Sequence, residues 1–138
     1  MTEDRAGRPG FVPWERPSPL LTAIGGFEQH PTDPLHVGFT VDGPKMNARG
    51  FLHGGAIAAI GDVAIGRALA TRSDPPVPLI TVNLSCDLLG TAREGEWVDV
   101  TISPTRAGRR LRAGTATFAT TRVIATVTAL FLPSAAPA

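Results

Sequence analysis

A single carboxylate stands in the middle of an otherwise apolar stretch. Residues 54–71 carry almost no charge, yet Asp62 lies at their centre, nine residues after His53. The residues one helical turn away from Asp62 are all small or apolar, and Arg67 is about 140° around a helix axis. Burying an unpaired carboxylate costs several kcal/mol. Asp62 is therefore predicted to find a partner elsewhere in the fold, in another subunit or in a ligand.

Two roles are compatible with such an aspartate. It could be a nucleophile or a general base that is kept dry until a substrate arrives. Alternatively, it is a structural acid that is bonded to a distant hydroxyl group or backbone amide, because structural networks also hold buried acids. The position of Asp62 alone leaves both roles open.

The segment His53-Gly54-Gly55 supplies a complementary feature at the start of the same stretch. Backbone N–H groups in the first turn of a helix are unpaired and carry a partial positive charge. Without side chains on the two glycines, a ligand oxygen could approach these amides closely, as an oxyanion hole requires. Alternatively, the glycines only allow a tight turn into the helix, and His53 caps the helix or packs against it.

Gly54 and Asp62 cannot act on one atom within one chain. They are eight residues apart, which is about 12 Å along a helix. If they cooperate, a two-fold dimer with antiparallel helices would bring Asp62 of one chain to Gly54 of the other. Cooperation therefore predicts a symmetric dimer with two shared sites.

The elements that would position these residues begin with helices. The apolar stretch predicts one long helix from about Gly54 to Thr71, and its lack of charge predicts that it is enclosed. Residues 18–25 predict a short helix with Ser18 as N-cap and Gly25 as its end. Residues 36–42 predict a strand, and residues 1–17 a loose N-terminal arm.

The rest of the chain predicts strands. Residues 80–88 alternate between apolar and polar side chains, which indicates one buried face. Further strands are expected at 96–103, at 109–121 with a weaker signal, and at 122–133, which is apolar on both faces and should be central or at an interface. Short connections make the sheet antiparallel. The expected fold class is α+β, a single antiparallel sheet wrapped around one long central helix.

Composition limits the class of protein. With 138 residues, the chain is expected to form one domain over 1–138. Hydrophobic residues make up 43% of the chain, which fits a globular protein. The net charge of +1 gives no electrostatic reason to expect a nucleic-acid or membrane partner. No run reaches the roughly 20 apolar residues of a spanning helix, and the start lacks a signal-peptide core. Cys86 is the only cysteine, which agrees with a cytoplasmic protein.

One pattern resembles a known family. Asn47-x-x-Gly50-x-x-His53-Gly54-Gly55, with Asp62 nine residues after the histidine, is similar to the hotdog-fold acyl-CoA thioesterases, and most of all to their phenylacetate-degradation (PaaI-like) branch. The resemblance extends over about residues 36–132. It implies a sheet wrapped around the helix, a homodimer with one continuous sheet, and often a homotetramer with shared active sites.

The resemblance also implies roles for five residues. Asp62 matches the catalytic carboxylate, and the Gly54 N–H matches the amide that polarises the thioester carbonyl. Asn47 matches a residue that positions water or the thioester, although it could be an ordinary turn residue. His53 matches a histidine that shapes the loop and contacts the thioester. Thr81 falls near a hydroxyl that orients water in some members, although a surface strand threonine is an equal alternative.

Substrate binding is expected at the helix start, through Gly55, and at a basic turn. Gly108 and Arg109 match a Gly-basic turn of the family, and Arg110 follows directly. Together with Arg106 and Arg112 they form a positive cluster. Arginine forks suit the phosphates of coenzyme A. A solvated surface turn is the alternative.

The function that the resemblance implies is hydrolysis of an acyl- or aryl-CoA thioester to a free acid and coenzyme A, with no cofactor and no metal. A non-catalytic acyl-CoA-binding module is the first alternative, although such a module has no need of a buried acid. A hydratase or dehydratase of the same fold is the second. It normally requires a histidine paired with an acid, and none of the three histidines has the expected context.

Overall fold

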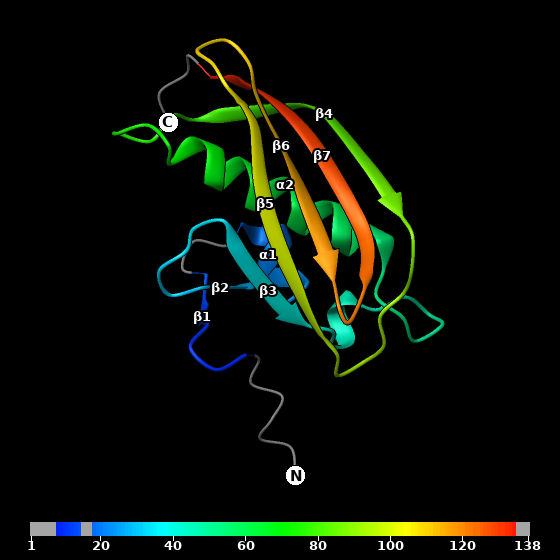
Figure 1. Ribbon diagram of the computed structural model, residues 1–138. Coiled ribbons are helices and arrows are strands. Elements are labelled where there is room, and N and C mark those ends of the chain that lie inside the picture. The colour runs from blue at the N-terminus through cyan, green and yellow to red at the C-terminus, as the bar shows by residue number, and fades with distance from the viewer. Residues whose placement is uncertain (1–7, 15–17, 135–138) are drawn as a thin grey trace.

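One antiparallel sheet wraps around one long helix in this protein (Figure 1). The computed structural model describes residues 8–14 and 18–134. Among the described residues, none of the helices combines the length and apolar character needed to cross a membrane. The elements are β1 (Val12–Pro13), α1 (Pro19–Ala23), β2 (Glu28–Gln29), β3 (His36–Thr40), the 3-10 helix η2 (Gly43–Lys45), α2 (Gly54–Ala70), β4 (Leu79–Leu88), β5 (Trp97–Ala107), β6 (Arg112–Ala119) and β7 (Val123–Pro133).

The two predicted helices are present. Ser18 caps α1 by accepting a hydrogen bond from the Leu21 N–H, as expected. α2 ends at Ala70, and Thr71 is its C-cap, with a hydroxyl that donates to the Arg67 carbonyl oxygen. The long apolar stretch therefore forms one helix, and its side chains fill the space inside the curved sheet.

Gly61 lets α2 approach the sheet closely. A Cβ atom at Gly61 would lie 2.9 Å from Cγ1 of Val127 on β7, nearer than side chains normally come. A glycine within a helix costs roughly 1 kcal/mol relative to alanine. The close contact between α2 and β7 explains why glycine stands here, directly before Asp62.

The strand order is β1-β2-β3-β5-β6-β7-β4. Every neighbouring pair is antiparallel, as predicted. β7 lies between β6 and β4, which confirms that residues 122–133 form a central strand. β4 is different, because it pairs with β7 and not with β5, its successor in sequence. The connection from β4 to β5 therefore crosses from one edge of the sheet towards the other.

The predicted buried face of residues 80–88 is wrong for the single chain. Ile80, Val82, Leu84 and Leu88 are 55%, 51%, 39% and 54% exposed. β4 is an edge strand, so only one of its two sides has a neighbouring strand in the sheet. A long apolar edge strand is a surface on which another chain can add.

A β-bulge in β4 changes which residues face the helix. The pairing shifts between Thr81 and Asn83, so that Thr81 lies opposite Phe131 and Leu84 lies opposite Ala129. Phe131 and Ala129 both point into the core. In a regular strand, Thr81 and Leu84 would lie on opposite faces, but the extra residue places both on the face towards α2.

The expectation of a loose N-terminal arm is wrong for residues 8–14, while residues 1–7 and 15–17 lie outside the described part. β1 pairs with β2, and the Trp14 N–H donates to the Phe27 carbonyl oxygen. Arg8 forms an ion pair with Asp99 on the face of the sheet away from α2. Burial by itself raises the pKa of Asp99, but hydrogen bonds from Trp97 and His36 and the charge of Arg8 outweigh it, so this pKa is lowered.

Arg112 fastens the end of α2 to the sheet. The residue is only 8% exposed. Its guanidinium donates to the Leu69 carbonyl oxygen at 2.9 Å and to the Ser73 hydroxyl at 2.9 Å. A third bond reaches the Gly108 carbonyl oxygen. The bond to Leu69 adds a donor to a carbonyl oxygen in the last turn of α2, and the other two bonds join that turn to Ser73 and to the Gly108 turn.

We expect Arg112→Met to lower the free energy of unfolding by about 2–4 kcal/mol, because buried hydrogen bonds from a charged group are lost. Urea titration followed by circular dichroism measures the change. Arg110→Met is the matched control, since Arg110 is exposed, and it should change the value by less than about 0.5 kcal/mol. Equal effects of the two substitutions would contradict this role of Arg112.

Candidate active site

Asp62 has a hydrogen-bond partner within the fold. It points from the middle of α2 to β4, where the Thr81 hydroxyl donates to its Oδ1 atom at 2.6 Å. This bond ties the Asp62 side chain to the edge strand of the sheet. The prediction of a distant partner is confirmed. The prediction of enclosure is wrong for the single chain, because the sheet covers only one side of α2 and leaves Asp62 partly exposed.

A hollow of about 300 Å³ lies beside this pair. Its wall is apolar over most of its area, which suits an acyl group, whereas the carboxylate of Asp62 and the hydroxyl of Thr81 supply polar groups. The described residues that line it are Trp14, Asp62, Val63, Gly66, Arg67, Ala70, Val77, Pro78, Leu79, Thr81 and Phe131.

The start of α2 leaves one amide available. Nδ1 of His53 accepts a hydrogen bond from the Gly55 N–H at 2.8 Å. The N–H groups of Ala56 and Ile57 donate to the His53 carbonyl oxygen. Within the described chain, the Gly54 N–H has no acceptor. Gly54 therefore offers a free donor at the positive end of the helix dipole.

His53 acts as the N-cap of α2, which is the capping role among its two alternatives. Because Nδ1 accepts from the Gly55 N–H, Nε2 is the ring nitrogen that can donate, and the described residues give it no acceptor. His53 and Gly55 also line a second hollow, of about 260 Å³, between α1 and α2. The two residues predicted at the helix start therefore lie together at a concave surface.

Gly54 and Asp62 remain apart within one chain, about 12 Å along α2. Leu88 on β4 lies against Gly54, where a Cβ atom would be 2.7 Å from its Cδ1 atom. β4 thus runs beside α2 from Thr81 near Asp62 to Leu88 near Gly54. Both candidate groups lie along the exposed edge strand.

Asn47 forms a turn. Its side-chain oxygen accepts hydrogen bonds from the N–H groups of Arg49 and Phe51. This is the turn role that the sequence left open, and it leaves only the side-chain NH₂ group of Asn47 to meet a ligand. The same turn fixes the loop that leads to His53.

The basic turn between β5 and β6 is divided in two. Arg106, Arg109 and Arg110 are exposed, whereas Arg112 is buried at the end of α2. The Gly108 N–H closes the turn by donating to the Leu111 carbonyl oxygen. Arg112 therefore does not belong to the surface that could meet phosphates.

The other histidines lie elsewhere. His36 pairs with Asp99, with 2.8 Å between Nε2 and Oδ1, on the face of the sheet away from α2. His30 stacks on His36 with ring centroids 5.6 Å apart. A histidine–acid pair is thus present, but the sheet separates it from Asp62.

Removing the Thr81 hydroxyl tests its link to Asp62. We expect Thr81→Val to lower kcat roughly 10- to 100-fold with little change in KM, because a charge-assisted hydrogen bond worth about 1.5–3 kcal/mol holds the carboxylate. Thr81→Ser keeps the hydroxyl and should retain most of the activity. Steady-state kinetics decide, and equal rates for the two variants would leave Thr81 without a role in positioning Asp62.

Among the residues that line the hollow, the sequence pointed only to Asp62 and Thr81, and the missed residues include Trp14 and Arg67. Trp14 comes from the segment that was expected to be loose, and no pattern in the sequence places it near α2. Arg67 carried a signal, since it is the other charged residue of the apolar helix besides Asp62.

Comparison with known proteins gives the family. The family model described as "Thioesterase superfamily" matches residues 49–126, which include both Gly54 and Asp62. The Pseudomonas aeruginosa protein PA0474, which carries the name of an esterase, is 38% identical over 104 residues, covering 74% of this chain and 78% of the relative.

Solved structures share the fold. The phenylacetic acid degradation protein PaaI of Thermus thermophilus, as its N33D mutant, has a TM-score of 0.72 at 20% identity, covering 85% of this chain and 100% of that chain. The protein smu.793 of Streptococcus mutans UA159, bound to acetyl CoA, has a TM-score of 0.67 at 20% identity, covering 72% and 79%. The sheet wrapped around one helix is thus the hotdog fold, and the chain belongs to the thioesterase superfamily.

Proposed function

We propose that this protein hydrolyses an acyl-CoA thioester to the free acid and coenzyme A. The observation that carries the proposal is the Asp62 carboxylate, held by the Thr81 hydroxyl beside a largely apolar hollow. Such a hollow accepts an acyl group while the carboxylate faces the thioester carbonyl. The acetyl CoA bound to the Streptococcus mutans neighbour supports coenzyme A as the carrier.

Two routes are compatible with this geometry. As a general base, Asp62 removes a proton from water, which attacks the carbonyl carbon. As a nucleophile, Asp62 attacks that carbon itself, and water then hydrolyses the resulting anhydride. In both routes the carbon–sulfur bond breaks and the sulfur leaves as the coenzyme A thiolate, which takes up a proton released by the water that is consumed. An amide such as the Gly54 N–H stabilises the negative oxygen.

The proposed site belongs to two chains. β4 has a free edge, and Val82, Leu84 and Leu88 expose apolar side chains on it. A second copy that adds along β4 would continue the sheet and set the two α2 helices antiparallel. Asp62 of one chain would then face Gly54 of the other. The dimer could stand alone or pair again into a tetramer.

The nucleotide of coenzyme A is proposed to lie near the basic turn. Arg106, Arg109 and Arg110 are exposed there, and the described residues give no ion pair to their guanidinium groups. Guanidinium groups bind phosphate oxygens in pairs. The turn lies near the C-terminal end of α2, and Gly54 of the same chain lies at the other end of that helix.

The test of the function is thiol release from a panel of alkyl- and aryl-CoA thioesters. The same acyl groups are offered as N-acetylcysteamine thioesters, which lack the nucleotide, and as oxygen esters, whose hydrolysis is followed by release of the free acid. We expect turnover of CoA thioesters, weaker turnover of the short thioesters and none of the oxygen esters. Tight binding of acyl-CoA without turnover would instead identify a binding module.

Mixing two inactive variants tests the shared site. Asp62→Asn and Gly54→Pro chains, refolded together, form mixed dimers in which one of the two sites has both groups intact. About a quarter of the natural activity should return, because half of the dimers are mixed and each has one good site of two. Gel filtration confirms the assembly. Mixed dimers without activity would exclude sites shared in this way.

A further inference from the structure

Arg67 has an unusual place beside the candidate site. It projects from α2 five residues after Asp62, and both residues line the same hollow. Among the described residues that line this hollow, Arg67 is the only cation and Asp62 the only anion. The rest of the wall is mostly apolar, so a charge at this position is an exception that calls for a partner.

Within the described chain, no acceptor pairs with the Arg67 guanidinium. The ion pairs of the described residues do not include Arg67, and its guanidinium makes no hydrogen bond there. What holds it is an aromatic face, because its Cζ atom lies over the Trp14 ring, 5.6 Å from the centroid. A guanidinium that lies on a ring keeps its N–H groups free for a planar acceptor such as a carboxylate.

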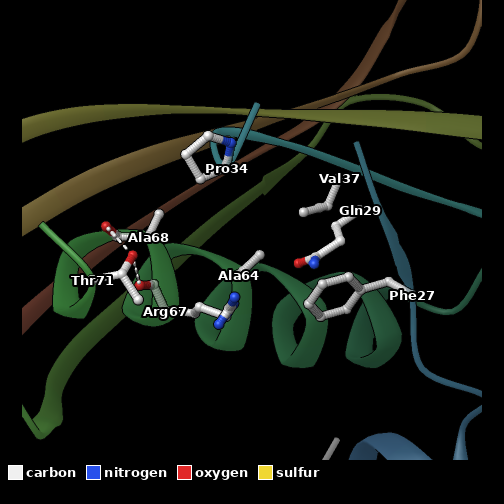
Figure 2. A pocket seen from close by; sticks show the side chains of 8 residues that line it. All are labelled: Phe27, Gln29, Pro34, Val37, Ala64, Arg67, Ala68 and Thr71. Atoms are coloured by element: carbon white, nitrogen blue, oxygen red, sulfur yellow. Dashed lines mark hydrogen bonds between the residues drawn. The ribbon is translucent and has the colours of Figure 1, made fainter. Parts of the chain in front are cut away.

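The aromatic support is itself rigid. Trp14 stacks on Phe27 with centroids 4.9 Å apart and an angle of 10° between the rings. The backbone N–H of Trp14 donates to the Phe27 carbonyl oxygen, which ties the N-terminal segment to the sheet. Figure 2 shows a smaller neighbouring pocket, which Arg67 also lines and in which its side chain extends along α2 towards the Phe27 ring. A fixed orientation lowers the entropy that binding costs.

The space between Asp62 and Arg67 sets the length of a ligand. Their Cα positions are five residues apart on α2, about 7.5 Å along the axis. The Arg67 side chain extends along the helix towards Ala64 (Figure 2), so its guanidinium lies nearer to the level of Asp62 than that spacing, and a ligand that joins the two groups carries a short acyl chain. Trp14 Nε1 adds a second donor nearby, since it is buried and has no partner among the described residues.

We infer that the acyl group of the natural substrate carries a carboxylate at its far end, and that Arg67, supported by Trp14, binds it. The substrate class is a CoA thioester of a short dicarboxylic acid. This inference rests on the proposed function, and it assigns Arg67 and Trp14 as specificity-determining residues. The negative acyl end would lie away from the Asp62 carboxylate, which reduces their repulsion.

Two thioesters of one chain length provide the test. Glutaryl-CoA and pentanoyl-CoA both have five carbons and differ in the terminal carboxylate. We expect the full-length protein to have a kcat/KM at least about tenfold higher for glutaryl-CoA, since only this thioester offers a carboxylate to the Arg67 guanidinium. In Arg67→Met the ratio should fall to about 1, and in Arg67→Lys to an intermediate value, because lysine lacks the fork.

Arg72→Met is the matched control. Arg72 is exposed beyond the end of α2, so this variant should keep both rates and their ratio. A natural protein without preference for glutaryl-CoA, or an Arg67→Met variant that keeps the preference, would overturn the inference. Pentanoyl-CoA turnover with no preference would leave the proposed function intact.

Binding gives an independent readout. Titration calorimetry with the Asp62→Asn protein compares the Kd of the same two thioesters without turnover. Tighter binding of glutaryl-CoA that disappears on adding Arg67→Met supports the inference, and equal Kd values overturn it. If both thioesters bind but the natural protein hydrolyses no thioester, only the proposed function fails.

Discussion

Asp62→Asn is expected to lower kcat for the best CoA thioester by about 10³-fold or more. Asparagine keeps the shape of the side chain and can still accept from the Thr81 hydroxyl, but it has neither a negative charge nor a basic oxygen. Both routes proposed for Asp62 need that oxygen, as a base or as a nucleophile. Thiol release in single-turnover and steady-state experiments measures the effect.

The control must separate chemistry from folding. Asp87→Asn makes the same exchange at an exposed position of β4 and should leave kcat unchanged. The melting temperature of Asp62→Asn should stay close to that of the natural protein, because Asp62 is only partly buried. A folded Asp62→Asn protein with undiminished kcat would show that the carboxylate is structural, and the mechanism would be wrong.

Gly54→Pro is expected to lower kcat by about 10²–10³-fold, the usual effect of losing one oxyanion donor. Proline has no N–H group, so this substitution removes the one amide of the first helical turn that is free within the described chain. The helix itself should persist, because proline is well tolerated at the first helical position. The extended backbone of His53, with ψ at 134°, also suits a following proline.

Gly54→Ala is the matched variant for this prediction. Both substitutions add a Cβ atom, which would lie 2.7 Å from Cδ1 of Leu88 and force that exposed side chain to rotate. Only the proline variant also loses the N–H group, so the ratio of their kcat values isolates the hydrogen bond. Similar rates for the two variants would mean that the oxyanion is stabilised elsewhere.

Local patterns in the sequence were enough for α1, α2, β3 and the strands that follow α2. The unbroken apolar stretch determined α2, because so few charges leave a helix no stable place except against a sheet. Alternation and short connections determined the strands after it, including the central β7. Asp62 stood out for the same reason, since a lone carboxylate among small apolar residues needs a partner that its own helix cannot supply.

The partner itself depended on the tertiary structure. A strict period of two puts Thr81 on the face opposite Leu84, and only the bulge in β4 turns both towards α2. The hydrogen bond to Asp62 follows from that extra residue. Alternation also could not tell whether the apolar face of β4 is covered, because strand order decides which strand becomes an edge.

By itself, then, the sequence determined the helix, the strands and the groups that could do the chemistry, since these depend on residues near one another in the chain. The tertiary structure alone decided what surrounds them. Trp14 is placed beside α2 by the pairing of β1 with β2. Arg112 is turned away from the other arginines of the basic turn and donates to the Leu69 carbonyl oxygen at the end of α2. Such contacts join segments far apart in sequence, and their energy depends on packing that no local pattern records.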